Sequence, residues 1–266
     1  MKNLLLSGCF AASLIVLTSC LGGGSEIHTA SGMPGVIRMD AKSGKMLIDA
    51  PYFAPYGFYA AGLSNSGFFP DDCILFSFSV DLGDPENADV ATKEYYTGSL
   101  ADIAIVDQYS CLGSMMDSTV LLNNEQKVAY AVDANYGSNG GYAIIISNKL
   151  FLFSDMTMMS GQQNQWVLYC DASNLEPIKD SSTSLNVYSF YLRSILSVPG
   201  KAPETNSIVV NAFEMGSVLN MIQNREKQGS QSEAILRINF VKDIKDEGET
   251  LVWDKSDLRI VIARES

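Results

Sequence analysis

The sequence of 266 residues contains one histidine, His28, and only 18 lysine and arginine residues against 30 aspartate and glutamate residues. A lone histidine near the N-terminus argues against Ser-His-Asp triads, Cys-His pairs and paired-histidine zinc sites. The net charge of −12 opposes binding to a phosphate backbone. No Walker, Gly-x-Gly-x-x-Gly or Gly-x-Ser-x-Gly motif occurs. The composition therefore argues against nucleic-acid binding, nucleotide enzymes and most familiar hydrolases.

The N-terminus has the pattern of a lipoprotein export signal. A basic start is followed by the apolar run Leu4–Leu17, which is shorter than the roughly 20 residues of a membrane-spanning helix. The next residues, Leu17-Thr18-Ser19-Cys20, form a bacterial lipobox, whereas the rival Leu6–Cys9 lacks a sufficient apolar segment before it. We expect residues 1–19 to be removed and a diacylglyceryl group on Cys20 to be the membrane partner. The expected location is the outer membrane or another part of a Gram-negative cell envelope.

A flexible tether is expected next. Residues 21–25 are Leu-Gly-Gly-Gly-Ser, a linker composition, and we assign residues 20–32 to the tether. His28 falls on this segment, where a single imidazole lacks supporting partners for catalysis or metal binding. We therefore expect His28 to be a solvated linker residue.

The remainder of the chain has the pattern of short strands. Ile74, Phe76, Phe78 and Val80 alternate with mostly polar residues, which places one face of a strand in a core. Many short strands between Gly, Asn and Asp turns indicate barrels or sandwiches, so the expected class is mostly β. Further strands are predicted near residues 35–40, 45–49, 95–107, 127–133, 142–147, 149–154, 166–171, 187–193, 207–213, 233–241 and 258–263.

Two domains and one helix are predicted. A polar break near residues 122–127 divides a small OB-like barrel at 33–124 from a β-sandwich at 125–266. Within the second domain, apolar residues repeat at helical spacing before a glycine, and they predict one short amphipathic helix. That helix would either close one end of the core, the favoured alternative, or cover the sandwich mouth as a lid. The residues of the pattern are Met215, Val218, Leu219, Ile222, Arg225, Lys227 and Gly229.

An aromatic cluster offers a candidate ligand site in the first domain. Its members are Tyr52, Tyr56, Phe58 and Tyr59. Aromatic faces on a barrel can stack against sugar rings, and strands 2 and 3 of OB barrels bind oligosaccharides. The favoured alternative is packing, because a small β domain needs large side chains to fill its interior.

Four carboxylates near the end of a predicted strand offer a candidate calcium site, formed by Asp81, Asp84, Glu86 and Asp89. Oxygen ligands on a turn suit Ca²⁺, but the spacing departs from an EF-hand, so an acidic hairpin loop is the favoured alternative. No other cofactor is expected. The adjacent Asp71 and Asp72 could supply hydrolase chemistry only with a facing carboxylate.

Three thiols other than the lipidated one remain: Cys73, Cys111 and Cys170. At most one intramolecular disulfide can form, and Cys73 with Cys111 would make the best pair because both lie in the predicted first domain. Buried free thiols are the favoured alternative.

The order of these parts resembles the NigD-like family of Gram-negative envelope lipoproteins. The resemblance rests on the lipobox and tether, followed by Gly35–Asp40, Cys73–Phe78, Lys149–Phe153 and Val187–Arg193. It implies an N-terminal OB barrel, a C-terminal β-sandwich and no established catalytic residues. We expect a non-enzymatic, lipid-anchored binding module for a protein or glycan partner. The alternatives are a glycan-binding lipoprotein of a polysaccharide-uptake system and a carboxylate-dependent hydrolase.

Overall fold

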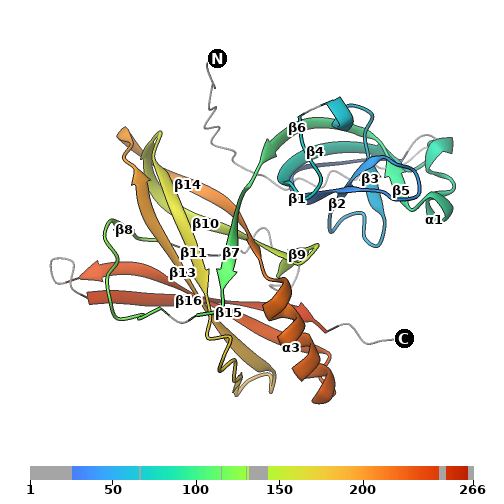
Figure 1. Ribbon diagram of the computed structural model, residues 1–266. Helices are drawn as coiled ribbons and strands as arrows, with labels where there is room; N and C mark the ends of the chain where they lie inside the picture. The colour runs from blue at the N-terminus through green and yellow to red at the C-terminus, as the bar shows by residue number, and fades with distance from the viewer. Residues whose placement is uncertain are drawn as a thin grey trace. The chain divides into compact units, whose positions relative to one another are not determined.

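The computed structural model describes residues 26–65, 67–114, 116–129, 131, 143–245 and 250–262. Its described residues form two compact units that divide between Asp107 and Gln108 (Figure 1). The signal peptide, Cys20 and the first part of the predicted tether lie outside the described residues. Among the residues described, no helix combines the length and apolar character needed to cross a membrane.

The first unit is a six-stranded sheet with the strand order β5-β3-β2-β1-β4-β6. The central strand β1 pairs antiparallel with both β2 and β4. Three short helical turns accompany the sheet: η1 (Leu63–Asn65), η2 (Pro85–Asn87) and α1 (Val90–Lys93). The strands are β1 (Ile27–Met39), β2 (Met46–Asp49), β3 (Gly57–Tyr59), β4 (Cys73–Asp81), β5 (Tyr95–Thr97) and β6 (Ser99–Ile105).

Strand β1 corrects the predicted tether. It begins at Ile27, so residues 27–32 belong to the sheet, and His28 pairs with Val80 of β4. The predicted tether extended to residue 32, but Ser31 and Gly32 lie at a bulge between Ala30 and Met33, where Gly32 adopts a φ of 65°. A bulge glycine and a linker glycine look alike in a sequence.

The strand predicted over residues 95–107 is two strands, β5 and β6, with Gly98 between them. A Cβ at Gly98 would lie 2.4 Å from the carbonyl oxygen of Ser79 and 2.8 Å from the Phe58 ring. The close approach explains why this position has no side chain.

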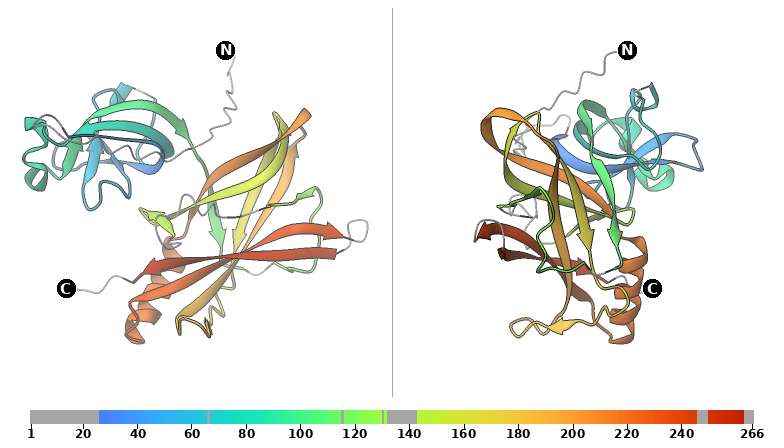
Figure 2. Two further views of the ribbon diagram at one scale, coloured as in Figure 1. Left: turned by 180° about the vertical axis from the view of Figure 1, so that it is seen from behind. Right: turned by 60° about the vertical axis from the view of Figure 1, so that its left-hand side comes forward.

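The second unit is one ten-stranded sheet with the order β16-β15-β13-β11-β7-β14-β10-β9, in which β8 and β12 pair with β13. The sheet curls, so that β15 and β16 run at an angle to β10 and β14 (Figures 1 and 2). The strands are β7 (Asp107–Leu112), β8 (Glu125–Gln126), β9 (Ile144–Ile146), β10 (Lys149–Ser160), β11 (Gln163–Tyr169), β12 (Ile178–Lys179), β13 (Asn186–Val198), β14 (Lys201–Glu214), β15 (Glu233–Lys245) and β16 (Thr250–Val261).

The predicted class is confirmed: the protein is mostly β, with a small N-terminal domain and a larger C-terminal domain that carries one predicted helix. The larger domain differs from a two-sheet sandwich because its strands belong to a single curled sheet. The described residues 127–129 and 131 are not in a strand, although a strand was expected there. Instead, Val128 and Ala129 donate backbone hydrogen bonds to Val241 and Asp155.

The division between the units lies before the polar break that suggested a boundary at residues 124 and 125. Strand β7 pairs with β11, and β8 pairs with β13, so the segment that follows Asp107 is part of the second sheet. A buried ion pair, described below, links this polar run to the second sheet.

The predicted helix is α3 (Gly216–Gln228), which lies at one end of the curled sheet (Figures 1 and 2). Met215 is its N-cap and Gly229 its C-cap. Its apolar stripe packs into the core of the second unit, which confirms the end-closing role. The stripe consists of Val218, Leu219 and Ile222, with Met215 beside them.

Candidate functional site

The second unit contains a pocket of about 350 Å³ on the outer side of α3, which we call the α3 pocket. One wall is a stripe of α3, and the facing wall is the segment 172–176 that follows β11. Tyr188 of β13 contributes to the lining and is itself buried. The volume falls within the usual range for ligand sites. The lining residues are Ala172, Ser173, Leu175, Glu176, Tyr188, Met221, Asn224, Arg225 and Gln228.

A buried carboxylate lies beside the pocket. Glu226 of α3 has no exposed surface. Its oxygens accept hydrogen bonds from Asn186 Nδ2 at 2.8 and 3.0 Å and from the Tyr188 hydroxyl. Burial, together with this hydrogen bond, raises the pKa of Tyr188 above its usual value. Glu226 therefore holds β13 against α3, and its satisfied oxygens are poorly suited to act as a general base.

The charges at the rim neutralise each other. Arg225 donates to Glu176 Oε1 at 2.9 Å and also to the carbonyl oxygen of Leu175. Both contacts fix the segment 172–176 against α3. The rim consequently presents no unpaired charge to a ligand.

Hydrogen bonds to Asp171 also order the beginning of the segment 172–176. Asp171 Oδ1 accepts hydrogen bonds from the Ser173 hydroxyl at 2.6 Å and from the backbone N–H groups of Ser173 and Asn174 at 3.1 Å. The Ser173 hydroxyl contributes most to the lowered pKa of Asp171. This side of the pocket is therefore largely pre-formed, which reduces the ordering cost of binding.

The remaining pocket groups favour uncharged ligands. Asn224 and Gln228 are exposed and lie four residues apart, on the same side of α3 as the half-exposed Met221. Amides both donate and accept hydrogen bonds, and Met221 adds apolar contact. The two carboxylates nearest the pocket are bound to other side chains, so the pocket provides no acid–base pair. Asp72 lies in the first unit, where it accepts a hydrogen bond from Phe69 N in a turn.

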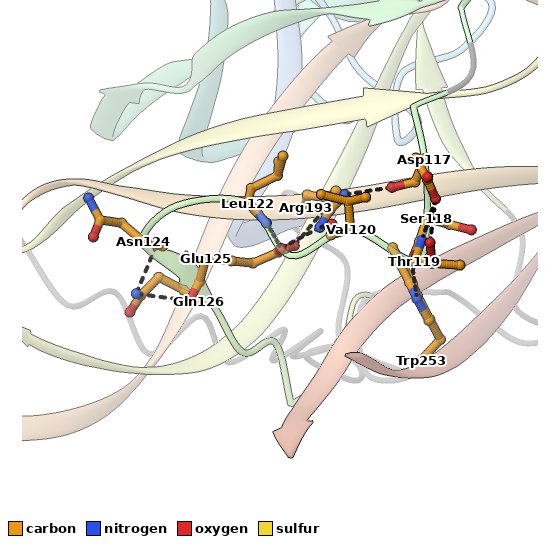
Figure 3. Close-up of polar contacts among 10 residues, drawn as sticks. All are labelled: Asp117, Ser118, Thr119, Val120, Leu122, Asn124, Glu125, Gln126, Arg193 and Trp253. Atoms are coloured by element: carbon orange, nitrogen blue, oxygen red, sulfur yellow. Dashed lines mark hydrogen bonds and ion pairs between the residues drawn. The ribbon is translucent and has the colours of Figure 1, made fainter. Parts of the chain in front are cut away.

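Arg193 and Glu125 form a buried ion pair that the sequence did not predict (Figure 3). Neither side chain has exposed surface. Arg193 Nε donates to Glu125 Oε1 at 2.6 Å, and a second guanidinium nitrogen donates to the other carboxylate oxygen. Burial opposes the charge, but the hydrogen bond and the charge of Glu125 outweigh it, so the pKa of Arg193 is raised.

The guanidinium also holds the segment between β7 and β8. It donates to the carbonyl oxygens of Val120 at 2.6 Å and Asp117 at 3.4 Å. Trp253 Nε1 donates to the Ser118 carbonyl oxygen at 3.0 Å in the same network (Figure 3). This cluster is a structural anchor, because its ionic groups are paired with each other and closed to solvent.

The predicted aromatic site is only partly supported. Phe58 is fully buried and stacks on Phe53 at 4.7 Å between ring centroids, so it belongs to the core and is unavailable to a ligand. Tyr52 is 40% exposed and its hydroxyl lies 2.7 Å from His28 Nδ1. His28 is thus a sheet residue with a side-chain partner, not a solvated linker residue.

Of the remaining tyrosines of that prediction, Tyr56 reaches the cluster around Phe53 only through Tyr96, and Tyr59 lies apart from it. Tyr56 contacts Tyr96, with ring centroids 6.2 Å apart. Tyr59 contacts Tyr95 at 5.8 Å, and the Lys45 ammonium lies 4.2 Å from the Tyr59 ring centroid. The four predicted aromatics therefore do not form one stacking platform.

Two carboxylates of the predicted calcium site accept backbone hydrogen bonds. Asp81 Oδ1 accepts the Gly83 N–H at 2.9 Å, and Asp84 Oδ1 caps η2 by accepting the Glu86 N–H at 2.8 Å. Within the described ranges, no three carboxylate, histidine or cysteine side chains, Asp89 included, cluster as metal ligands would. The Asp81 and Asp84 side chains thus help to form the turn that follows β4.

We expect calcium to leave the thermal unfolding midpoint unchanged. A site occupied at 100 times its Kd would stabilise the protein by about 2.7 kcal/mol, which is readily detected. The measurement is thermal denaturation with millimolar Ca²⁺, with a chelator as the control. A saturable rise of the midpoint with Ca²⁺ would contradict the assignment of these carboxylates to turn formation.

Comparison with known proteins relates the first unit to a known family. Residues 24–104 match the family described as Lipoprotein OB domain. No curated protein matches the chain significantly.

Solved structures share the fold over most of the chain. A protein of Parabacteroides merdae is 20% identical, with a TM-score of 0.75, and the match covers 88% of this chain and 99% of that one. A proposed lipoprotein of Bacteroides fragilis is 13% identical, with a TM-score of 0.54 and coverage of 85% and 96%. A NigD-like immunity protein of Bacteroides caccae also matches, at 6% identity, a TM-score of 0.45 and coverage of 88% and 94%. The comparisons thus identify residues 24–104 as a lipoprotein OB domain and relate the chain's fold to these proteins of Parabacteroides and Bacteroides.

Proposed function

We propose that the protein is a lipid-anchored binding protein of the bacterial cell envelope, and that its α3 pocket holds a neutral saccharide unit of a glycan. The observation that carries the ligand class is the mutual neutralisation of Arg225 and Glu176 beside a wall of amide side chains. A charged ligand would find no unpaired partner there. A hydroxyl-rich neutral ligand would find donors and acceptors together with the apolar surface of Met221.

The envelope location rests on the lipobox at Cys20 and is supported by the match to a lipoprotein OB domain. A binding role accords with the state of the pocket carboxylates. Glu226 is buried and hydrogen-bonded, and Glu176 is ion-paired, so neither of these two pocket carboxylates is free to act in hydrolysis.

The test is calorimetric titration of the detergent-solubilised protein with neutral mono- and disaccharides, with uronic acids and short peptides as comparison ligands. We expect a neutral saccharide to bind and the Asn224→Ala variant to bind it about five- to tenfold more weakly, because one hydrogen-bonding amide is lost. Gln223→Ala is the matched control, since this residue is an amide of α3 outside the pocket lining.

Two results would contradict the ligand assignment. One is equal binding by the Asn224→Ala and Gln223→Ala variants, which would place the site elsewhere. The other is binding of peptides or uronic acids without any neutral saccharide, which would leave a binding protein with a different ligand.

A further inference from the structure

Two of the three thiols are brought together by neighbouring strands of the second unit. β7 and β11 are parallel, and Cys111 pairs with Leu168 while Leu112 pairs with Tyr169. Cys170 continues this ladder, because its N–H donates to the Leu112 carbonyl oxygen at 3.0 Å. Side chains alternate along a strand, so Cys170 points to the same face as Leu168 and therefore as Cys111.

The environment of the two side chains agrees with this placement. Cys170 is buried in the core cluster of the second unit, and Cys111 is half-buried and packs against the same cluster. Their thiols form a hydrogen bond, which raises the pKa of Cys111 and lowers the pKa of Cys170.

The third thiol belongs to the other unit. Cys73 begins β4 of the first unit and is fully buried, whereas Cys111 belongs to β7 of the second unit. The pairing of Cys73 with Cys111 expected from a shared domain is therefore not the one that the fold favours. Its premise fails because the units divide at residue 107, before Cys111.

We propose that Cys111 and Cys170 form a disulfide in the exported protein and that Cys73 remains a thiol. The proposal rests on the envelope location, because disulfides persist in oxidising compartments. It does not depend on the ligand of the α3 pocket.

The chemistry is thiol–disulfide exchange with an external disulfide, R–S–S–R, as the oxidant. The half-exposed Cys111 loses its proton and attacks this disulfide, forming a mixed disulfide and releasing one R–S⁻. The Cys170 thiolate then attacks the Cys111 sulfur and expels the second R–S⁻. Both departing thiolates take up the protons of the two cysteines, so two thiols are oxidised and one external disulfide is reduced to two R–SH.

The bond would reinforce a weakly paired strand. β7 is the first element of the second unit and lies between β14 and β11, and its pairing with β11 consists of the two register pairs named above. A link between residues 111 and 170 closes a long loop, which restricts the unfolded chain and so stabilises the folded unit.

The test is mass spectrometry of protein purified from membranes, denatured and alkylated without reductant. We expect one alkylated cysteine, Cys73, and a linked peptide pair containing Cys111 and Cys170. If the protein is reduced before alkylation, three cysteines should be alkylated. Reduction should also lower the thermal midpoint of the second unit by about 5–10 °C. Cys73→Ser should retain the link, whereas Cys111→Ser should abolish it.

A second preparation separates the possible failures. The protein without residues 1–20, retained in the cytoplasm, should contain three thiols and should form the same link when treated with oxidised glutathione. A link formed only by this treatment would mean that the proposed location is wrong and the thiol geometry right. Three free thiols in both preparations, or a link that includes Cys73, would overturn the proposed disulfide.

Discussion

Replacing Arg193 with methionine is expected to lower the free energy of unfolding of the second unit by about 3–5 kcal/mol. The variant leaves the carboxylate of Glu125 buried without its cation. It also removes the donor to the carbonyl oxygens of Val120 and Asp117. Buried groups without partners cost more than exposed ones because they cannot return to water.

Denaturant unfolding followed by tryptophan fluorescence provides the measurement. Both tryptophans, Trp166 and Trp253, lie in the second unit, so the signal reports on that unit alone. Arg259→Met is the matched control, since the Arg259–Glu233 pair is partly exposed and should contribute less than about 1 kcal/mol. Equal unfolding midpoints for the two variants would show that the buried pair does not anchor the unit.

A double variant separates the cost of the unpaired charge from the cost of the lost hydrogen bonds. Adding Glu125→Leu to Arg193→Met removes the uncompensated charge, and it should restore part of the lost stability. Full restoration is not expected, because the two backbone carbonyls of the segment between β7 and β8 still lack their donor.

Replacing Cys20 with alanine is expected to move the protein out of the membrane fraction almost completely. The acyl chains would be the anchor, with about 0.8 kcal/mol contributed by each buried CH₂. The acidic surface offers no electrostatic substitute on anionic lipids. Cell fractionation followed by immunoblotting gives the distribution, and intact mass shows whether an acylated chain begins at residue 20.

Cys9→Ala serves as the control, because Cys9 ends the rival lipobox. This variant should remain in the membrane fraction. If Cys9→Ala released the protein from the membrane, or if the Cys20→Ala variant stayed in the membrane fraction, the lipid would be on another residue or a different feature would attach the protein.

Local patterns predicted the elements that depend on local physics. The alternation from Ile74 to Val80 corresponds to β4, because one face of that strand packs into the core of the first unit. The spacing from Met215 to Ile222 corresponds to α3, whose capping glycine is at the expected position. The aromatic cluster was recognised, but composition alone could not show that Phe58 faces inward while Tyr52 remains 40% exposed.

The missed features depend on contacts between distant residues. Glu125 and Arg193 are 68 residues apart, and the polar run around Glu125 suggested an exposed linker because consecutive polar residues are usually solvated. Glu226 follows Ile222 by four residues, so a carboxylate at a core-facing helix position was the available signal. The proximity of Cys111 and Cys170 required the register of two parallel strands, which no local pattern specifies.

The early start of β1 limits how far the OB domain can stand from a bilayer. With the lipid on Cys20 and the sheet beginning at Ile27, six residues connect them. Even fully extended, such a connection reaches only roughly 20 Å. The first residue of the sheet would therefore stay within roughly 20 Å of the lipid.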